Sequence, residues 1–322
     1  MKENFWTKLK NPISVSAPMA GVTDVAFRYM LAEKGAPDVV FTEMISLAGV
    51  RIKGELEFAS IMKFTVRERP IVFQFFGSTP NEFTLCGMLA QKYDADGIDI
   101  NTGCPDKGVE KQGAGASIIK SPALAQEIIV ATKESARGIP VSIKTRIGYA
   151  NANEMERWIQ CLAETKPSAI TIHGRTRAEK RKGMANWEKI KQAGIIIKSI
   201  SPETKIIGNG DVKSKEDGER LVKTASIDGY MVGRALIGNP WFFAGRSVTK
   251  AEKIAAARDH LQAFRELLGD LSSTNVKTKG FDLMKKHFAG YINDFVGAKE
   301  LRIKLMEAKS FNEAETILNA LG

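Results

Sequence analysis

The stretch Gly97-Ile98-Asp99-Ile100-Asn101-Thr102-Gly103-Cys104-Pro105 decides how this chain is expected to fold. Its first four residues form a mostly apolar run typical of a buried strand, and the five that follow predict a tight turn. Cys104 is either a small buried residue or a thiol held out of the packing for chemistry, and the turn by itself favours neither. Asn101 supplies a donor and an acceptor suited to the edge of a planar heterocycle.

Seven other runs of the same kind accompany this strand, with helical patterns between them. The expected strands are 13–17, 39–42, 71–75, 97–100, 141–144, 169–172, 205–207 and 229–232, and the expected helices are 24–34, 80–92, 122–135, 153–164, 187–192 and 215–223. Eight mostly apolar strands alternating with helices predict an α/β protein built as a (β/α)8 TIM barrel. A doubly wound open sheet is the competing architecture, which the lack of a GxGxxG motif after the first strand disfavours.

After residue 245 the pattern changes to helices alone. Amphipathic runs at 250–269, 280–295, 298–307 and 312–321 predict a small C-terminal helical bundle docked on the barrel. We therefore expect two domains, a barrel in residues 1–245 and a helical domain in residues 246–322.

Chemically distinctive residues follow every expected strand. Because the carboxyl ends of barrel strands converge on one face, where barrel enzymes place their sites, we expect these residues to meet. They are Pro18-Met19-Ala20-Gly21, Glu43-Met44, Gln74, Asn101 to Cys104, Lys144 to Arg146, His173-Gly174-Arg175, Gly208-Asn209-Gly210-Asp211 and Gly233-Arg234.

The ends of the seventh and eighth strands suit a phosphate group. Glycine N–H groups and a short helix N-terminus at these two strands form the phosphate cradle of many barrels, and Arg234 would neutralise the charge. The alternative is that these glycines serve only tight turns. The pairing of the two motifs at these strands favours phosphate binding.

Three side chains at other strand ends suit an aromatic cofactor. The Lys144 ammonium would stabilise an anionic reduced flavin ring, and Gln74 would pair with the pyrimidine edge of such a ring. A lone histidine is more often structural than functional, but the convergence of His173 with Lys144 favours a role in the site. With three histidines in the chain, and none beside a ligand-like partner at helical spacing, we expect no metal site.

Composition narrows the remaining classes of protein. The 322 residues contain three cysteines, too few for a disulfide framework, and the polar N-terminal segment and short apolar runs predict neither a signal peptide nor a membrane span. We expect a cytoplasmic protein without an obligatory protein partner. The net charge is +10, and residues 175–191 hold seven basic and two acidic residues, which makes that segment the expected anchor for a polyanion.

The motifs together resemble the FMN-dependent tRNA-dihydrouridine synthase family. The resemblance covers residues 14–318 and extends to the order and spacing of the motifs and to the all-helical tail. The matching motifs are Ala17-Pro18-Met19-Ala20-Gly21-Val22-Thr23-Asp24, Asn101 to Pro105 with Gly113-Ala114-Gly115-Ala116, Lys144-Thr145-Arg146, His173-Gly174-Arg175-Thr176-Arg177, Asn209-Gly210-Asp211 and Gly233-Arg234.

The resemblance implies FMN as cofactor, NADPH as electron donor and tRNA or another structured RNA as partner. It places at the cofactor Pro18, Met19, Ala20, Gln74, Lys144, His173, Asn209, Gly210, Asp211, Gly233 and Arg234. Residues implied to contact the uracil or the RNA are Asn101, Arg146, Arg175, Arg177, Arg181 and, in the helical RNA-binding domain, Lys286.

The implied reaction is reduction of the C5–C6 bond of uridine to dihydrouridine. Hydride passes from N5 of FMN to C6, and Cys104 gives its proton to C5, as a thiol with a pKa near 8.5 is able to do at neutral pH. The uracil must leave its stack to reach the flavin. Two departures, Thr102 and the run Glu179-Lys180-Arg181, concern which uridine is chosen rather than the reaction class.

Two other readings stay open from the sequence. One is an FMN barrel that acts on a free pyrimidine, as a dihydroorotate dehydrogenase-like enzyme does; the basic loop and the helical tail argue against it. The other is a non-catalytic RNA-binding protein, against which Cys104, Lys144 and the phosphate motifs argue. The target uridine, the choice between tRNA and ribosomal RNA, the preference between NADPH and NADH, and the oligomeric state are not fixed by these residues.

Overall fold

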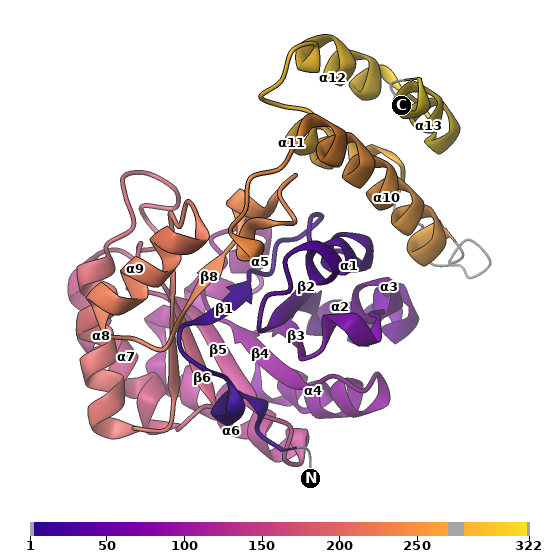
Figure 1. The fold of residues 1–322 in the computed structure, drawn as a ribbon. Coiled ribbons are helices and arrows are strands. Elements are labelled where there is room, and N and C mark those ends of the chain that lie inside the picture. The colour runs from indigo at the N-terminus through magenta and orange to yellow at the C-terminus, as the bar shows by residue number, and fades with distance from the viewer. Residues whose placement is uncertain (1–2, 270–279, 321–322) are drawn as a thin grey trace.

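Eight parallel strands form one sheet at the centre of the molecule in the computed structural model, which describes residues 3–269 and 280–320 (Figure 1). Neighbouring strands follow the order β1-β8-β7-β6-β5-β4-β3-β2. Their bounds are β1 Ile13–Ser16, β2 Val40–Ser46, β3 Ile71–Phe76, β4 Gly97–Asn101, β5 Val141–Arg146, β6 Ala169–His173, β7 Lys205–Asn209 and β8 Gly229–Val232.

The sheet closes between its first and last strands in this order. The Ser16 N–H donates to the Val39 carbonyl at 3.0 Å, and the Val39 N–H donates to the Ser14 carbonyl at 3.2 Å, just before β2 begins. The predicted barrel is therefore confirmed, and the open doubly wound sheet is wrong. Each expected strand is present. Ile71–Phe76, for example, is buried along its whole length, as its nearly continuous apolar pattern predicts.

Helices surround the barrel, most of them where the sequence predicts them (Figure 1). The expected helix 187–192 is wrong at its end, because α8 continues through Gly194, where a Cβ would lie 3.1 Å from Ile227, and through the apolar run 195–197 to Ile200. Sequence reasoning missed α2, α3 and α5. The α-helices of this part are α1 Val25–Lys34, α2 Leu47–Lys53, α3 Ala59–Met62, α4 Pro80–Lys92, α5 Lys107–Lys111, α6 Pro122–Ala136, α7 Met155–Glu164, α8 Trp187–Ile200 and α9 Lys215–Ala225.

Short 3-10 helices fill several connections. They are η1 Phe5–Lys8, η2 Glu55–Phe58, η3 Val66–Glu68, η4 Gly115–Lys120, η5 Ala152–Glu154, η6 Arg234–Leu236 and η7 Phe242–Ala244. Of these, η4 and η6 matter for function, since η4 follows the Cys104 turn and η6 begins at the end of β8.

Among the described residues after the barrel, four helices pack together, and α10 and α11 join them to α1 of the barrel (Figure 1). A capping box between Thr249 and Glu252 starts the first of them. The contact with the barrel is close, because a Cβ on Gly238 would meet the Gly290 backbone at 2.0 Å. The helices are α10 Lys250–Leu268, α11 Asp282–Tyr291, α12 Ala298–Glu307 and α13 Phe311–Asn319.

The predicted helical tail is thus present, although α11 is shorter than the expected helix 280–295 and the end of the expected helix 312–321 lies outside the described residues. The division of the chain at residue 245 stays a prediction. No helix in residues 3–269 and 280–320 combines the length and the hydropathy that crossing a lipid bilayer requires.

Candidate active site at the carboxyl end of the barrel

A cavity of about 800 Å³ opens where β5 to β8 and β1 end. Its volume lies within the range of about 300–1,000 Å³ that small-molecule sites occupy. Twelve of the predicted site residues line it, so the convergence expected of barrel strand ends is found here. They are Pro18, Met19, Lys144, Arg146, His173, Arg175, Arg181, Asn209, Gly210, Asp211, Gly233 and Arg234.

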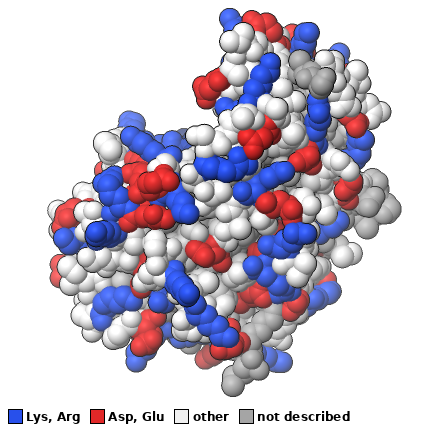
Figure 2. Space-filling view, in the orientation of Figure 1, with Lys and Arg blue, Asp and Glu red and all other residues white. Residues whose placement is uncertain are grey.

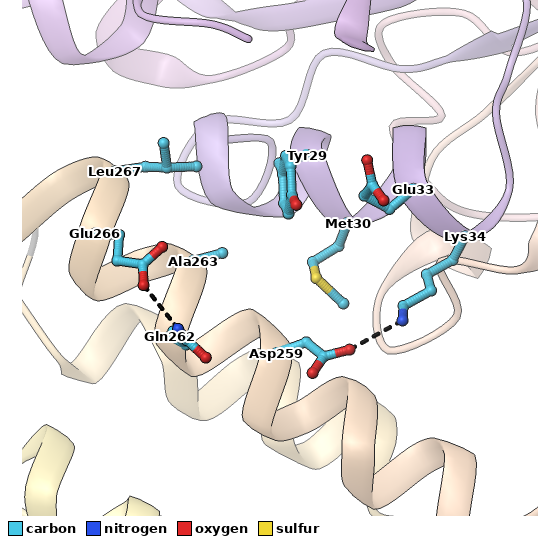
Figure 3. Close-up of a pocket in the computed structure, with 9 residues that line it drawn as sticks. All are labelled: Tyr29, Met30, Glu33, Lys34, Asp259, Gln262, Ala263, Glu266 and Leu267. Atoms are coloured by element: carbon cyan, nitrogen blue, oxygen red, sulfur yellow. Dashed lines mark hydrogen bonds and ion pairs between the residues drawn. The ribbon is translucent and has the colours of Figure 1, made fainter.

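A second cavity, of about 350 Å³, lies between α1 and α10 (Figure 3). An ion pair between Lys34 and Asp259, 2.9 Å apart, joins the two helices beside it, and Gln262 donates to Glu266 along α10. None of the predicted site residues lines this cavity. It lies where the barrel helix α1 meets the C-terminal helix α10. The candidate site is therefore the cavity at the strand ends.

Lys144 ends inside the first cavity. Its Nζ donates to Oδ1 of Asn209 at 3.2 Å, and Nδ2 of Asn209 donates to the Met231 carbonyl at 2.8 Å. Burial, with the charge of Arg146, lowers the pKa of Lys144 to about 8. The ammonium is therefore still charged at neutral pH, yet it gives up its proton more readily than an exposed lysine does.

His173 faces the same space as a neutral ring. Burial and the positive charges of Arg146 and Lys144 lower its pKa to about 2. Nη1 of Arg175 lies 3.3 Å from Nε2. Because a guanidinium only donates, Nε2 must accept, which places the ring proton on Nδ1. The ring of His173 thus has one N–H donor, at Nδ1, and no charge.

Asp211 has a different arrangement from the phosphate contact predicted for it. It accepts hydrogen bonds from Arg175, from the Ala185 N–H at 2.8 Å and from Arg234 at 3.3 Å. Burial alone would raise the pKa of Asp211, but these bonds and the two arginine charges lower it overall. An ionised carboxylate repels phosphate, so its geometry suits placing Arg234 rather than meeting the phosphate itself.

The backbone at Gly233 leaves room for a ligand, whereas a Cβ at Gly210 would lie 2.6 Å from that of Ala185. Gly210 has a φ of +124°, a backbone conformation that disfavours other residues, and a Cβ on Gly233 would meet only Met19 Sδ and Ala17 Cβ, at 3.4 and 3.6 Å. The Arg234 side chain is 62% exposed at the start of η6. The open backbone at Gly233 is thus followed directly by an exposed guanidinium, and phosphate binding at the two glycine motifs stays a prediction.

The predicted basic loop, residues 175–182, is held from inside. The buried Arg175 donates to the carbonyls of Lys182 and Gly183, at 3.2 and 2.6 Å, and to Asp211. Arg177 pairs with Glu110 through both carboxylate oxygens. Arg175 and Arg177 thus bind groups of the protein itself, and the exposed basic side chains of the loop are Lys180, Arg181 and Lys182.

The face drawn in Figure 2 shows basic and acidic side chains interspersed. On this face the net charge of +10 is not gathered into a single positive patch. A polyanion bound on this face would therefore meet local groups of cations rather than one continuous positive surface.

The turn that carries Cys104 has partners for its backbone groups. Oδ1 of Asn101 accepts the N–H groups of Gly103 and Cys104, both at 3.0 Å. The Ala116 N–H donates to the Cys104 carbonyl at 3.0 Å. The thiol is half-buried, and burial raises its pKa above the ordinary value. Cys104 is thus a protonated thiol in a fixed turn beside the cavity rather than in its lining.

Gln74 and Asn101 lie beneath this turn, buried, and outside the lining of the cavity. Nδ2 of Asn101 donates to Oε1 of Gln74 at 2.9 Å, and Nε2 of Gln74 donates to Asp99 at 2.8 Å. Sequence reasoning missed Asp99 as the partner of Gln74. The signal was present, since it is an acid in the middle of an otherwise apolar strand and buried acids are rare.

Lys286 and Ala20 lie at the loop after β1. Lys286 Nζ donates to the Gly21 carbonyl, and the Gly21 N–H donates to Oε1 of Glu43. Ala20 is exposed in the same loop. The structure therefore places Lys286 next to the loop that contains Pro18 and Met19, which line the cavity, and its role toward RNA stays a prediction.

The whole chain is similar to proteins of one family. The family model described as dihydrouridine synthase (Dus) matches residues 15–321. A probable tRNA-dihydrouridine synthase of Staphylococcus aureus (strain COL) is 36% identical over 322 residues, which span 99% of this chain and 96% of that protein. The probable tRNA-dihydrouridine synthase 2 of Bacillus subtilis (strain 168) is 35% identical, over 99% of this chain and 97% of that protein.

Solved structures with the same fold are more distant in sequence. Histamine dehydrogenase from Rhizobium sp. 4-9 superposes with a TM-score of 0.53 at 13% identity, over 77% of this chain and 48% of that one. A variant of NCR from Zymomonas mobilis superposes with a TM-score of 0.50 at 12% identity, over 74% of this chain and 88% of that one. At this identity the likeness concerns the barrel fold alone.

Proposed function

The chain belongs to the dihydrouridine synthase family, and we propose that it reduces the C5–C6 double bond of uridines in folded tRNA, with FMN as cofactor and NADPH as the source of electrons. The observation that carries this proposal is the placement of a protonated thiol, Cys104, beside a cavity that contains a buried cation, Lys144, and a neutral donor, His173.

The residues around the cavity fit an aromatic cofactor with a phosphate tail. Lys144 and the Nδ1–H of His173 would meet polar atoms of the ring system, and the open backbone at Gly233 with the exposed Arg234 would hold the phosphate. Met19 and Pro18 would supply apolar contact. When bound, reduced FMN supplies the hydride that adds to C6 of the uracil, and NADPH restores it.

The chain itself supplies the proton. As hydride adds to C6, negative charge develops toward C5, and the Cys104 thiol gives its proton there to complete the C–H bond. The resulting thiolate regains a proton from solvent, so the protein is unchanged after each turnover. Burial that raises the pKa of Cys104 keeps the thiol protonated between turnovers.

The substrate is proposed to be RNA because the loop beside the cavity carries Lys180, Arg181 and Lys182 on its exposed side. These cations would hold phosphates around a uridine that has left its stack. Because such contacts release counterions, binding of tRNA should weaken steeply with salt. The buried Arg146 and Arg175 keep the loop in place for these contacts.

The test compares the Cys104→Ala and Cys161→Ala variants with the unaltered protein. Both variants remove a thiol, but Cys161 lies on α7 and bonds to the Pro122 carbonyl away from the cavity. We expect all three proteins to bind FMN and to accept electrons from NADPH, and only Cys104→Ala to lose formation of dihydrouridine in a tRNA transcript. Full turnover by Cys104→Ala would remove the thiol from the acid role, and turnover of free uridine without RNA would overturn the substrate.

A further inference from the structure

A chain of buried polar side chains runs beneath the Cys104 turn, across three neighbouring strands. Oγ of Ser142 donates to Oδ1 of Asp99 at 2.7 Å, and Nε2 of Gln74 donates to Oδ2 of Asp99 at 2.8 Å. Nδ2 of Asn101 donates to Oε1 of Gln74 at 2.9 Å. Oδ1 of Asn101 then accepts the N–H groups of the turn.

The strand register places these residues side by side. Gln74 is opposite Asp99 in the β3–β4 pair, and Asp99 is opposite Ser142 in the β4–β5 pair. Asn101 lies two residues beyond Asp99 on the same face of β4, because side chains alternate along a strand. The chain is therefore built into the barrel wall and does not depend on a mobile loop.

The two ends of this chain fix the direction of every hydrogen bond within it. An ionised carboxylate only accepts, and backbone N–H groups only donate. Gln74 must therefore turn its NH2 group toward Asp99 and its oxygen toward Asn101. Asn101 must in turn direct its NH2 group to Gln74 and its oxygen to the N–H groups of the turn. Rotating either amide by 180° would set donor against donor and acceptor against acceptor.

We propose that Asp99 is a positioning residue for Cys104. It orients the side-chain amides of Gln74 and Asn101, so that the Asn101 oxygen holds the turn that carries the thiol. This inference rests on the proposed function of Cys104. It gives a reason for a carboxylate in the barrel wall, where burial is costly and raises the pKa of Asp99 to about 6.

The proposal makes an exchange of residues the decisive experiment. In Asn101→Asp the new carboxylate still accepts the N–H groups of the turn, but it faces the oxygen of Gln74 across a contact that now lacks a hydrogen. Adding Asp99→Asn reverses the direction of these hydrogen bonds. The amide introduced at position 99 would donate to the Gln74 oxygen, and the Gln74 NH2 group would donate to the carboxylate introduced at position 101. Every hydrogen bond is then satisfied again, with the Gln74 amide pointing the other way.

The readout is the rate at which iodoacetamide alkylates Cys104 in the full-length protein, followed by mass spectrometry of the Cys104 peptide. Burial raises the pKa of the Cys104 thiol, so a loosened turn that exposes the thiol lowers this pKa and speeds alkylation. Each unit by which the thiol pKa falls increases the thiolate fraction about tenfold. We expect Asn101→Asp to alkylate roughly tenfold faster than the unaltered protein, and the double variant with Asp99→Asn and Asn101→Asp to return to within about twofold of it. The control combines Asn101→Asp with Asp282→Asn. It has the same net charge as the double variant, but its second substitution lies at an exposed site on α11.

The outcomes separate cleanly. A double variant that alkylates as fast as Asn101→Asp, or an Asn101→Asp variant that behaves as the unaltered protein does, would overturn the proposal. If Asn101→Asp is recovered only as insoluble protein, soluble folded protein after adding Asp99→Asn supports the proposal, and its absence overturns it. Alkylation is independent of uridine reduction, so loss of the proposed function would show in the tRNA assay of the unaltered protein and not here.

Discussion

Arg146 donates a hydrogen bond from Nε to the carbonyl oxygen of Gly103, 2.7 Å away, and so ties the end of β5 to the turn that carries Cys104. Its Nη1 reaches the carbonyls of Thr176 and Lys180, at 3.0 and 3.2 Å. One buried guanidinium therefore holds both the proposed proton donor and the proposed RNA-binding loop. Its Nε and Nη1 thus meet the protein's own carbonyls, and the direct contact with RNA predicted for Arg146 stays a prediction.

Replacing Arg146 by Met should disorder the turn and the loop together. Three charge-assisted hydrogen bonds are lost, and carbonyls are left unpaired in a buried place, which we expect to cost about 2–4 kcal/mol of unfolding free energy. Turnover on tRNA should fall at least about tenfold. Denaturant unfolding and the dihydrouridine assay measure the two effects. Arg181→Met is the control, because replacing this exposed residue should weaken tRNA binding and leave stability unchanged. Equal stability of the two variants would contradict the prediction.

Gly115 is expected to be indispensable for the position of Cys104. It has a φ of +61°, and a Cβ there would lie 2.8 Å from the Cys104 carbonyl oxygen. Gly297 has a φ of +84° with nothing within 4 Å of a Cβ, so both Ala variants bear a left-handed strain of about 1 kcal/mol, but only Gly115→Ala collides with the turn. We expect Gly115→Ala to lose more stability and to lose dihydrouridine formation, while Gly297→Ala keeps its turnover. Similar turnover in the two variants would contradict the steric argument.

The ion pair between Arg28 and Glu68 should matter far more than that between Arg67 and Glu33. Arg28 and Glu68 are both fully buried, with Nε and Oε2 2.7 Å apart, whereas the Arg67 side chain is 65% exposed. Arg28→Met leaves the Glu68 charge buried without its partner, at a cost of about 3–5 kcal/mol, whereas Arg67→Met should change stability by less than about 1 kcal/mol. Chemical denaturation of both variants measures the difference, and comparable losses would refute it.

The strands of the barrel could be predicted because burial on both faces leaves a direct trace in the sequence. Ile71–Phe76 is apolar at five of its six positions and is buried throughout. The short helices α2, α3 and α5 leave no such trace, since helices of four to seven residues do not complete an amphipathic pattern. The position of the cavity followed from the fold, because strand ends must converge in a closed barrel.

The partners of the site residues could not be predicted in the same way. The sequence shows Arg177 in a basic segment, but Glu110, its partner, is 67 residues away. Asp211 stands in a glycine motif typical of phosphate binding, and only the structure shows Arg175 and Arg234 on it. Residue type and chain order therefore predict which residues gather, whereas pairings between distant loops depend on side-chain geometry that no local pattern records.

Two buried histidines make the packing of the C-terminal helices against α1 of the barrel sensitive to acid. The rings of His260 and His287 lie 4.6 Å apart, and His287 stacks on Phe27 of α1 at 5.0 Å. Burial lowers the pKa of His260 to about 3; burial, with the charges of His260 and Lys286, lowers that of His287 well below its ordinary value. Because the unfolded chain binds protons near pH 6.5 and the folded one does not, the stability that these rings contribute is complete above pH 6.5 and is lost as the pH falls toward the folded pKa.

His287→Phe should therefore flatten the acid side of the stability curve. Neither ring nitrogen of His287 has a hydrogen-bond partner in the described ranges 3–269 and 280–320, so the variant keeps the stacking on Phe27 and loses no bond. At pH 8 we expect equal or slightly higher stability than in the unaltered protein. At pH 4.5 the variant should gain about 2–3 kcal/mol relative to it, since each unit of pH below 6.5 costs about 1.4 kcal/mol per buried neutral histidine. Unfolding curves measured from pH 8 to 4.5 test this, and curves that stay parallel for the two proteins would mean that His287 accepts a proton in the folded state.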